Sequence, residues 1–128
     1  MLSHLSNKTV LITGASGYIG SFLVKKILSL NVFKIKLITR RKINLKRENL
    51  EIIYLENIVQ YNDWVSIIKD VNYVFHLIGV SHYSKSLRGQ KDYFNNVNFL
   101  LTEKIVKASL ISKVEKIIFL SSIKVNGE

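Results

Sequence analysis

The chain has 128 residues and a formal net charge of +10, with 48% hydrophobic residues and no cysteine or proline. This length and composition are typical of one globular domain and exclude a disordered chain. The absence of cysteine excludes disulfide and thiolate chemistry. No apolar run reaches the roughly 20 residues of a membrane span, and the N-terminal residues lack the pattern of a signal peptide. We therefore expect a cytoplasmic protein with no membrane partner.

The clearest signal lies in residues 9–20, Thr-Val-Leu-Ile-Thr-Gly-Ala-Ser-Gly-Tyr-Ile-Gly. The apolar run predicts a buried strand over residues 8–13, and an amphipathic helix is predicted over about residues 17–30. Gly14, Gly17 and Gly20 recur between them at intervals of three. Such glycines permit a tight turn, let a pyrophosphate approach main-chain N–H groups, and let the helix pack closely on the strand. This context predicts a dinucleotide-binding turn, and the alternative is a turn with only a structural role.

The first helix is expected to end at Asn31 in a left-handed conformation. Its buried face is expected to consist of Ile19, Phe22, Leu23, Ile27 and Leu30. Further strands are predicted over residues 34–39, 50–55, 71–78 and 115–121, and further helices over residues 61–69 and 92–111. Trp64, Val65 and Ile68 are expected to point inward from the shorter of these helices. The longer helix is expected to have Phe94, Val97, Leu101, Ile105 and Ala108 on one stripe.

Buried strands that alternate with helices predict an α/β fold with a Rossmann-type, doubly wound parallel sheet. Right-handed crossovers give the strand order 3-2-1-4-5 in a three-layer α/β/α arrangement. The sequence stops soon after the predicted fifth strand, whereas such domains usually continue to a sixth. We therefore expect residues 1–128 to form the NAD(P)-binding N-terminal portion of a longer protein, truncated before the sixth strand and the substrate domain.

The positive charge is densest in residues 40–47, which contain no aromatic residue of the kind that stacks on bases. We expect no nucleic-acid partner and assign part of the cluster a local role. Arg40 lies 20 residues beyond Gly20, where an NAD site commonly has a carboxylate for the ribose 2′-hydroxyl. Arg40 and Arg41 instead offer guanidinium groups that can clamp a 2′-phosphate. The sequence therefore favours NADP over NAD, and the alternative is that both arginines only solvate a loop.

Four motifs in this order resemble those of extended short-chain dehydrogenases/reductases, and more narrowly the NAD-dependent epimerase/dehydratase family. They are residues 13–20, His76-Leu-Ile-Gly79, Val97-Asn98 and the Ser-Ser-Ile-Lys-Val-Asn-Gly stretch over residues 121–127. The resemblance covers essentially the whole chain, and the last motif is most similar to that of bacterial UDP-sugar 4-epimerases. It implies a homodimeric isomerase or lyase that transiently oxidises a nucleotide sugar at C4. The alternatives are an NADPH-dependent reductase of the same fold and a non-catalytic NAD(P)-binding module.

The resemblance also implies roles for individual residues. The glycine motif would hold the pyrophosphate, and Asn57, which replaces the family's usual aspartate, would accept a hydrogen bond from the adenine amino group. Ser122 is the expected catalytic residue, because it matches the serine or threonine that hydrogen-bonds the sugar hydroxyl. The expected cofactor contacts are Gly14, Ser16, Gly17, Tyr18, Ile19, Gly20, Arg40, Arg41, Asn57, Ile58, Leu77, Ile78, Gly79, Asn98 and Ser121.

The family's catalytic base is a tyrosine followed four residues later by a lysine, and none of the six tyrosines here is followed in this way. We therefore expect the 128-residue chain to be inactive by itself. His76, at the end of a buried strand, is expected to be a packed and hydrogen-bonded residue rather than a base. No metal is expected, because no histidines or carboxylates have the spacing of metal ligands.

Overall fold

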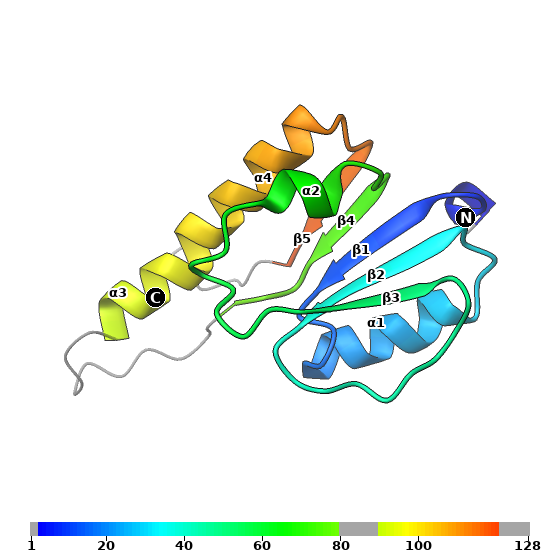
Figure 1. The fold of residues 1–128 in the computed structure, drawn as a ribbon, viewed down its shortest axis with the longest axis horizontal. Coiled ribbons are helices and arrows are strands. Elements are labelled where there is room, and N and C mark those ends of the chain that lie inside the picture. Colours follow the sequence, from blue (N-terminus) through cyan, green and yellow to red (C-terminus); the bar gives the residue numbers. More distant parts are fainter. Residues whose placement is uncertain (1–2, 80–89, 121–128) are drawn as a thin grey trace.

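The computed structural model describes residues 3–79 and 90–120. Ser121 and Ser122 lie outside these residues. The sheet strands are β1 (Thr9–Thr13), β2 (Lys34–Thr39), β3 (Leu50–Tyr54), β4 (Tyr73–His76) and β5 (Lys116–Phe119). They form one sheet in the order β3-β2-β1-β4-β5, in which every neighbouring pair is parallel (Figure 1). This confirms the predicted doubly wound sheet and its strand order.

The helices lie on both faces of this sheet. They are α1 (Tyr18–Leu28), α2 (Trp64–Ile68), α3 (Gln90–Asn95), the π-helical turn η2 (Asn96–Leu100) and α4 (Leu101–Ile111), and a short 3-10 helix, η1 (Ser3–Leu5), precedes β1. Helix α1 covers one face, whereas α2 and α4 cover the other (Figure 1). The predicted three layers are therefore confirmed. Within the described ranges, no helix is both long and apolar enough to cross a bilayer.

Alternate residues of the strands supply the two halves of the core, because side chains of a strand point to opposite faces. The half beneath α1 contains Val10, Ile12, Val24, Ile27, Ile35 and Leu37. The half beneath α2 and α4 contains Leu11, Ile38, Trp64, Ile68, Val74, Leu101 and Ile105. Four of the five residues in the predicted stripe of the long helix are confirmed as buried, since Val97, Leu101, Ile105 and Ala108 are all at most 3% exposed, and the side chain of the fifth, Phe94, lies outside the described part.

The predicted buried face of α1 is wrong in two positions. Phe22 is 61% exposed and Ile19 is 49% exposed, and the fully buried positions are Gly20, Val24 and Ile27. The helix is turned so that Gly20, rather than an aromatic ring, packs against the backbone of Gly14 and Ala15 in the turn that follows β1. Val65 of α2 is also 39% exposed, contrary to the prediction, while its neighbour Trp64 is buried.

The end of α1 also differs from the prediction. The non-glycine residues with positive φ in the described part of the chain are Asn7 and Lys113, so Asn31 is not left-handed. The helix instead ends at Leu28 with a tightened turn, in which the Ser29 N–H donates to the Lys26 carbonyl over 3.1 Å and the Ser29 hydroxyl donates to the same oxygen over 2.6 Å. The serine thus satisfies a terminal carbonyl that a left-handed residue would otherwise help to pair.

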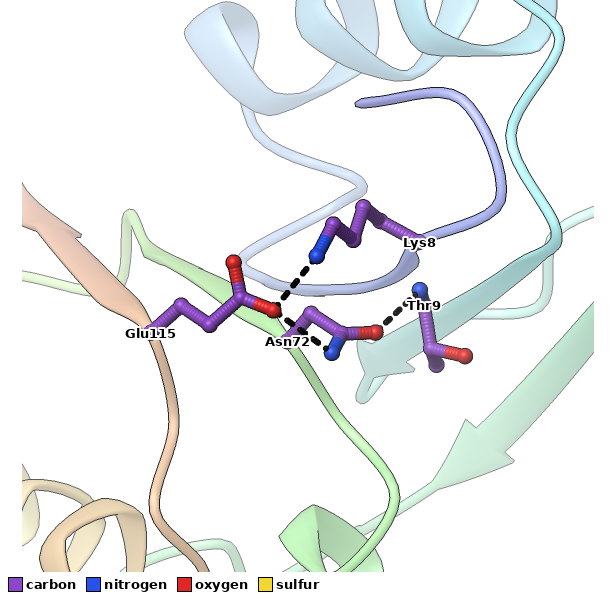
Figure 2. Close-up of polar contacts among 4 residues, drawn as sticks. All are labelled: Lys8, Thr9, Asn72 and Glu115. Atoms are coloured by element: carbon purple, nitrogen blue, oxygen red, sulfur yellow. Dashed lines mark hydrogen bonds and ion pairs between the residues drawn. The ribbon is translucent and has the colours of Figure 1, made fainter. Parts of the chain in front are cut away.

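A polar network of Lys8, Thr9, Asn72 and Glu115 joins the amino ends of β1, β4 and β5 (Figure 2). These strand ends lie opposite the carboxyl ends, where the glycine turn follows β1. Asn72 Oδ1 accepts from the Thr9 N–H over 2.8 Å, and Asn72 Nδ2 donates to Glu115 Oε1 over 3.0 Å. Lys8 Nζ donates to the same carboxylate oxygen over 2.6 Å. This hydrogen bond lowers the pKa of the Glu115 carboxyl and raises the pKa of the Lys8 ammonium group. The network fixes the starts of β1, β4 and β5 relative to one another.

Candidate functional site

The carboxyl ends of the five parallel strands meet at one edge of the sheet, where ligands of open α/β sheets bind. The glycine turn follows β1, residues 40–41 follow β2, residues 55–58 follow β3, and residues 77–79 follow β4. The strand order reverses between β1 and β4, so the glycine turn and residues 77–79 flank the topological switch point, where open α/β sheets bind their ligands. The structure therefore brings most of the predicted cofactor contacts to the same edge.

The glycine turn packs tightly on itself and on the end of β4. Gly14 has a φ of 72°, which favours glycine, and a Cβ atom added there would lie 3.0 Å from the Leu77 carbonyl carbon. The Gly17 N–H donates to the Gly14 carbonyl over 3.0 Å. A Cβ atom on Gly20 would lie only 2.0 Å from that same carbonyl oxygen. Glycine is therefore required at both Gly14 and Gly20 by the fold itself.

Gly17 has a different role, because its backbone is ordinary. It is the N-cap residue of α1 with a φ of −74° and a ψ of 174°, and it has no side chain with which to satisfy the N–H groups of the first helical turn. Ser16 is exposed, and Tyr18 is 83% exposed at the same turn. The helix N-terminus and its dipole suit an anion, and a small N-cap residue lets that anion approach.

The segments after β2 and β3 carry the residues that we expect to contact the adenosine half of the cofactor. Arg40 and Arg41 are exposed, and Thr39 Oγ1 both accepts from the Arg41 N–H over 3.1 Å and donates to the Arg41 carbonyl over 2.9 Å. Asn57 is exposed, whereas Ile58 is only 5% exposed and belongs to the core under α2 and α4. The Ile58 side chain therefore anchors the loop and leaves little surface for a cofactor.

Lys104 also donates hydrogen bonds to this loop, and sequence reasoning did not identify these contacts. Its Nζ reaches from α4 to the Val59 carbonyl over 2.8 Å and to the Tyr61 carbonyl over 3.5 Å. The Trp64 indole N–H donates to the same Tyr61 carbonyl over 3.1 Å. The loop that carries Asn57 is thus attached to two helices, although nothing in the local sequence around Lys104 indicates so distant a partner.

The segment after β4 forms the nicotinamide side of the expected site. The Leu77 N–H donates to the Thr13 carbonyl over 3.3 Å and to Thr13 Oγ1 over 3.2 Å. Ile78 is partly buried, and a Cβ atom on Gly79 would lie 3.5 Å from Asn98 Oδ1. Asn98 belongs to the π-helical turn η2, and such turns recur at functional sites. The predicted group of Leu77, Ile78, Gly79 and Asn98 is therefore adjacent in space.

His76 is 1% exposed and lies just behind this segment. Its Nδ1 is 2.7 Å from Thr13 Oγ1, its Nε2 is 2.9 Å from Thr102 Oγ1, and its ring stacks on Phe119 at a centroid distance of 5.6 Å. Burial lowers the pKa of His76 to about 4, so the ring is neutral at pH 7. The prediction of a packed, hydrogen-bonded histidine is confirmed. Sequence reasoning did not identify Thr13 and Thr102 as its partners.

Comparisons with known proteins agree with this arrangement. A UDP-glucose 4-epimerase of Vibrio cholerae is 30% identical over 122 residues, which cover 94% of this chain and 37% of the relative. A solved structure of a UDP-N-acetylglucosamine 4-epimerase from Methanobrevibacter ruminantium M1, in complex with UDP-N-acetylmuramic acid, is 31% identical and has a TM-score of 0.80. The match covers 96% of this chain and 40% of the epimerase chain. The structure of MoeE5 in complex with UDP-glucose and NAD is 28% identical and has a TM-score of 0.78, and the match covers 93% of this chain and 38% of the MoeE5 chain.

The chain therefore spans about two fifths or less of the length of these relatives. A sequence profile of the NAD dependent epimerase/dehydratase family matches residues 10–128, from β1 onward. This match covers nearly the whole chain, including the glycine turn and the segment after β4. The chain belongs to the NAD dependent epimerase/dehydratase family.

Proposed function

We propose that this chain is the nucleotide-binding part of a nucleotide-sugar epimerase or dehydratase, most similar to a UDP-glucose 4-epimerase, and that it binds NAD or NADP across the carboxyl edge of its sheet. The observation that carries the proposal is the turn before α1. Gly14 and Gly20 are required for packing, but Gly17 has an ordinary backbone conformation and borders the helix N-terminus. A turn whose N-cap residue has no side chain leaves the N–H groups of the first helical turn accessible, and this arrangement fits a diphosphate.

In this proposal, four segments of the described chain each contact a different part of the cofactor. The N–H groups that open α1 hold the pyrophosphate, and Asn57 accepts from the adenine amino group. Leu77, Ile78 and Gly79 lie along the nicotinamide half, with Asn98 behind Gly79. When bound, the nicotinamide supplies a hydride acceptor for oxidation at sugar C4. The chain's own residues bind and orient the cofactor, and Ser122, outside the described residues, would hydrogen-bond the sugar hydroxyl.

The choice between NAD and NADP rests on opposing observations. Arg40 and Arg41 are exposed where a 2′-phosphate would lie, which favours NADP. The similar MoeE5 structure holds NAD, which favours the unphosphorylated cofactor. Replacement of both arginines by alanine should weaken NADP binding about tenfold and leave NAD binding unchanged if the guanidinium groups contact the phosphate. Lys46→Ala in the same basic loop is the matched control, and equal losses for both cofactors would reject the contact.

Isothermal titration calorimetry of the 128-residue chain with NAD, NADP and ADP-ribose tests the proposal directly. We expect weak binding of at least one of them, with ADP-ribose retaining most of the affinity because the adenosine diphosphate half contacts the glycine turn. The absence of heat for all three at millimolar concentration would reject dinucleotide binding. The resemblance also supports a homodimer and a UDP-sugar substrate, which sedimentation velocity and titration with UDP-glucose would examine.

A second candidate function is that of a non-catalytic NAD(P)-binding module, and a third is an NADPH-dependent reductase of the same fold. The first of these is favoured by the absence, within the 128 residues, of a tyrosine followed four positions later by a lysine. An assay for conversion of UDP-glucose to UDP-galactose discriminates among them. We expect no turnover by the 128-residue chain, and turnover by the protein that contains a Tyr-x-x-x-Lys motif beyond it would identify the epimerase.

A further inference from the structure

We propose that Thr13, His76 and Thr102 form a hydrogen-bond relay of fixed direction, in which His76 is a neutral positioning residue that locks the end of β4 between the glycine turn and η2. The inference deepens the proposed function and rests on it for its consequence, because the locked segment is the one expected to carry the nicotinamide. The relay itself rests only on the positions of side chains in the described residues.

The direction of the relay follows from the one group that cannot donate. In the structure the Thr102 hydroxyl donates its single hydrogen to the Asn98 carbonyl over 3.0 Å. Towards His76 the same hydroxyl can then only accept, over 2.9 Å, and Nε2 must therefore carry the ring hydrogen. In a neutral ring Nδ1 is then bare, so it accepts from the Thr13 hydroxyl over 2.7 Å. The Leu77 N–H completes the series by donating to Thr13 Oγ1 over 3.2 Å.

The surroundings of the ring favour its neutral form. Thr13 is fully buried, His76 is 1% exposed, and Phe119 of β5 stacks on the ring with an interplanar angle of 24°. The polar groups that the structure places against the ring come from β1 and α4, and both are threonine hydroxyls that do not titrate. Among residues 3–79 and 90–120, no carboxylate contacts the ring, so a buried imidazolium would lack a partner there and the neutral tautomer with hydrogen on Nε2 is the stable one.

The relay joins three elements around the topological switch point, namely β1, β4 and α4. Thr13 is the last residue of β1, directly before the glycine turn, and it pairs with His76 in the sheet register. Thr102 lies in the first turn of α4, and its hydroxyl reaches back to the carbonyl of Asn98 in the π-helical turn. In that turn the Leu101 N–H donates to the Asn96 carbonyl, five residues earlier. His76 thus connects the residue before the glycine turn to the residue that contacts Asn98, and it thereby fixes the distance between the glycine turn and Asn98.

The tautomer can be observed directly by 15N–1H correlation spectroscopy of the ring nitrogens in the 128-residue chain. His4→Gln and His82→Gln variants assign the signals of His76 by subtraction. We expect a neutral ring with hydrogen on Nε2 only, unchanged between pH 8 and pH 5. A ring with hydrogen on Nδ1, or one that titrates near the ordinary histidine pKa of about 6.5, would overturn the relay.

The positioning consequence is tested with a matched pair at Thr102. Thr102→Ser keeps the hydroxyl and should bind NADH within about twofold of the unchanged chain, whereas Thr102→Val leaves Nε2–H unpaired and should weaken binding about five- to tenfold. Circular dichroism and thermal melting establish that both variants are folded, and the pair Thr13→Ser and Thr13→Val repeats the comparison if Thr102→Val is not. Equal NADH affinity for the serine and valine variants would overturn the positioning role. Failure of the unchanged chain to bind NADH would instead reject the proposed function, while the ring tautomer would still decide the relay.

Discussion

Replacement of Gly20 by alanine should unfold the domain more easily, although alanine is the better helix former. The added Cβ would lie 2.0 Å from the Gly14 carbonyl oxygen and 2.9 Å from the Gly14 carbonyl carbon, both of which are backbone atoms. Real Cβ atoms essentially never approach closer than 3.0 Å, so α1 has to move about 1 Å away from the turn. No side-chain rotation can relieve this contact.

The expected cost follows from two opposing terms. Overpacking of a tight contact costs about 1–3 kcal/mol, and the backbone clash places Gly20→Ala at the upper end of that range. The gain in helix propensity returns about 1 kcal/mol. The net loss is about 2 kcal/mol, which for a domain of this size lowers the melting temperature by about 8 °C.

Gly17→Ala is the matched control, because its effect should fall on binding rather than on folding. Its φ of −74° suits any residue, and its Cβ would lie 3.3 Å from the Gly14 carbonyl oxygen, so the fold should lose only about 0.5–1 kcal/mol. The methyl group would obstruct an anion at the start of α1 and should weaken NADH binding about tenfold or more. Thermal melting and NADH fluorescence titration separate the two effects. A Gly20→Ala variant with the melting temperature of the unchanged chain would refute the packing argument. A Gly17→Ala variant that binds NADH as tightly as the unchanged chain would refute the binding argument.

Two further predictions concern the polar groups at the two ends of β4. Asn72→Ala removes the acceptor of the Thr9 N–H and should lower the free energy of unfolding by about 1–2 kcal/mol in chemical denaturation. Lys8→Met, the control, should change it little because exposed ion pairs contribute little. Equal losses for the two variants would contradict the role of Asn72. His76 has a folded-state pKa of about 4 against an ordinary value of 6.5. The unfolded chain therefore binds more protons between these values, and the stability present above pH 6.5 should fall by about 3 kcal/mol as the pH drops to 4. His76→Asn should flatten the curve of unfolding free energy between pH 4.5 and 6.5, and a curve unchanged by this substitution would contradict the buried neutral ring.

The sheet, its strand order and the glycine turn could all be predicted from the sequence, because each depends on local patterns. Apolar runs mark buried strands, and glycine spacing next to a strand marks the turn. The orientation of α1 could not be predicted, since helical periodicity gives weight to Phe22 and none to Gly20. The structure shows the opposite, because the contact between α1 and the backbone of Gly14 and Ala15 requires a residue without a side chain, whereas Phe22 is exposed.

The contacts behind the candidate site could not be predicted for a different reason. The partners of His76 are 63 and 26 residues away in the chain, and Lys104 lies 45 residues from Val59. No local pattern in the sequence specifies such pairs. The burial of Ile58 is similar: the resemblance to the family assigned its position to the cofactor, whereas the structure assigns its side chain to the core beneath α2 and α4.

The two polar networks act on the same pair of strands from opposite ends. At the start of β1 and β4, Asn72 pairs with Thr9, and at their carboxyl ends His76 pairs with Thr13. Between these ends the strands are joined by main-chain hydrogen bonds and apolar packing, which leave their separation fixed but carry little specificity for register. A one-residue slip would separate Asn72 from Thr9 and His76 from Thr13, so both networks oppose it. Since β1 and β4 flank the switch point, their register also fixes how the glycine turn lies relative to residues 77–79, between which we place the dinucleotide.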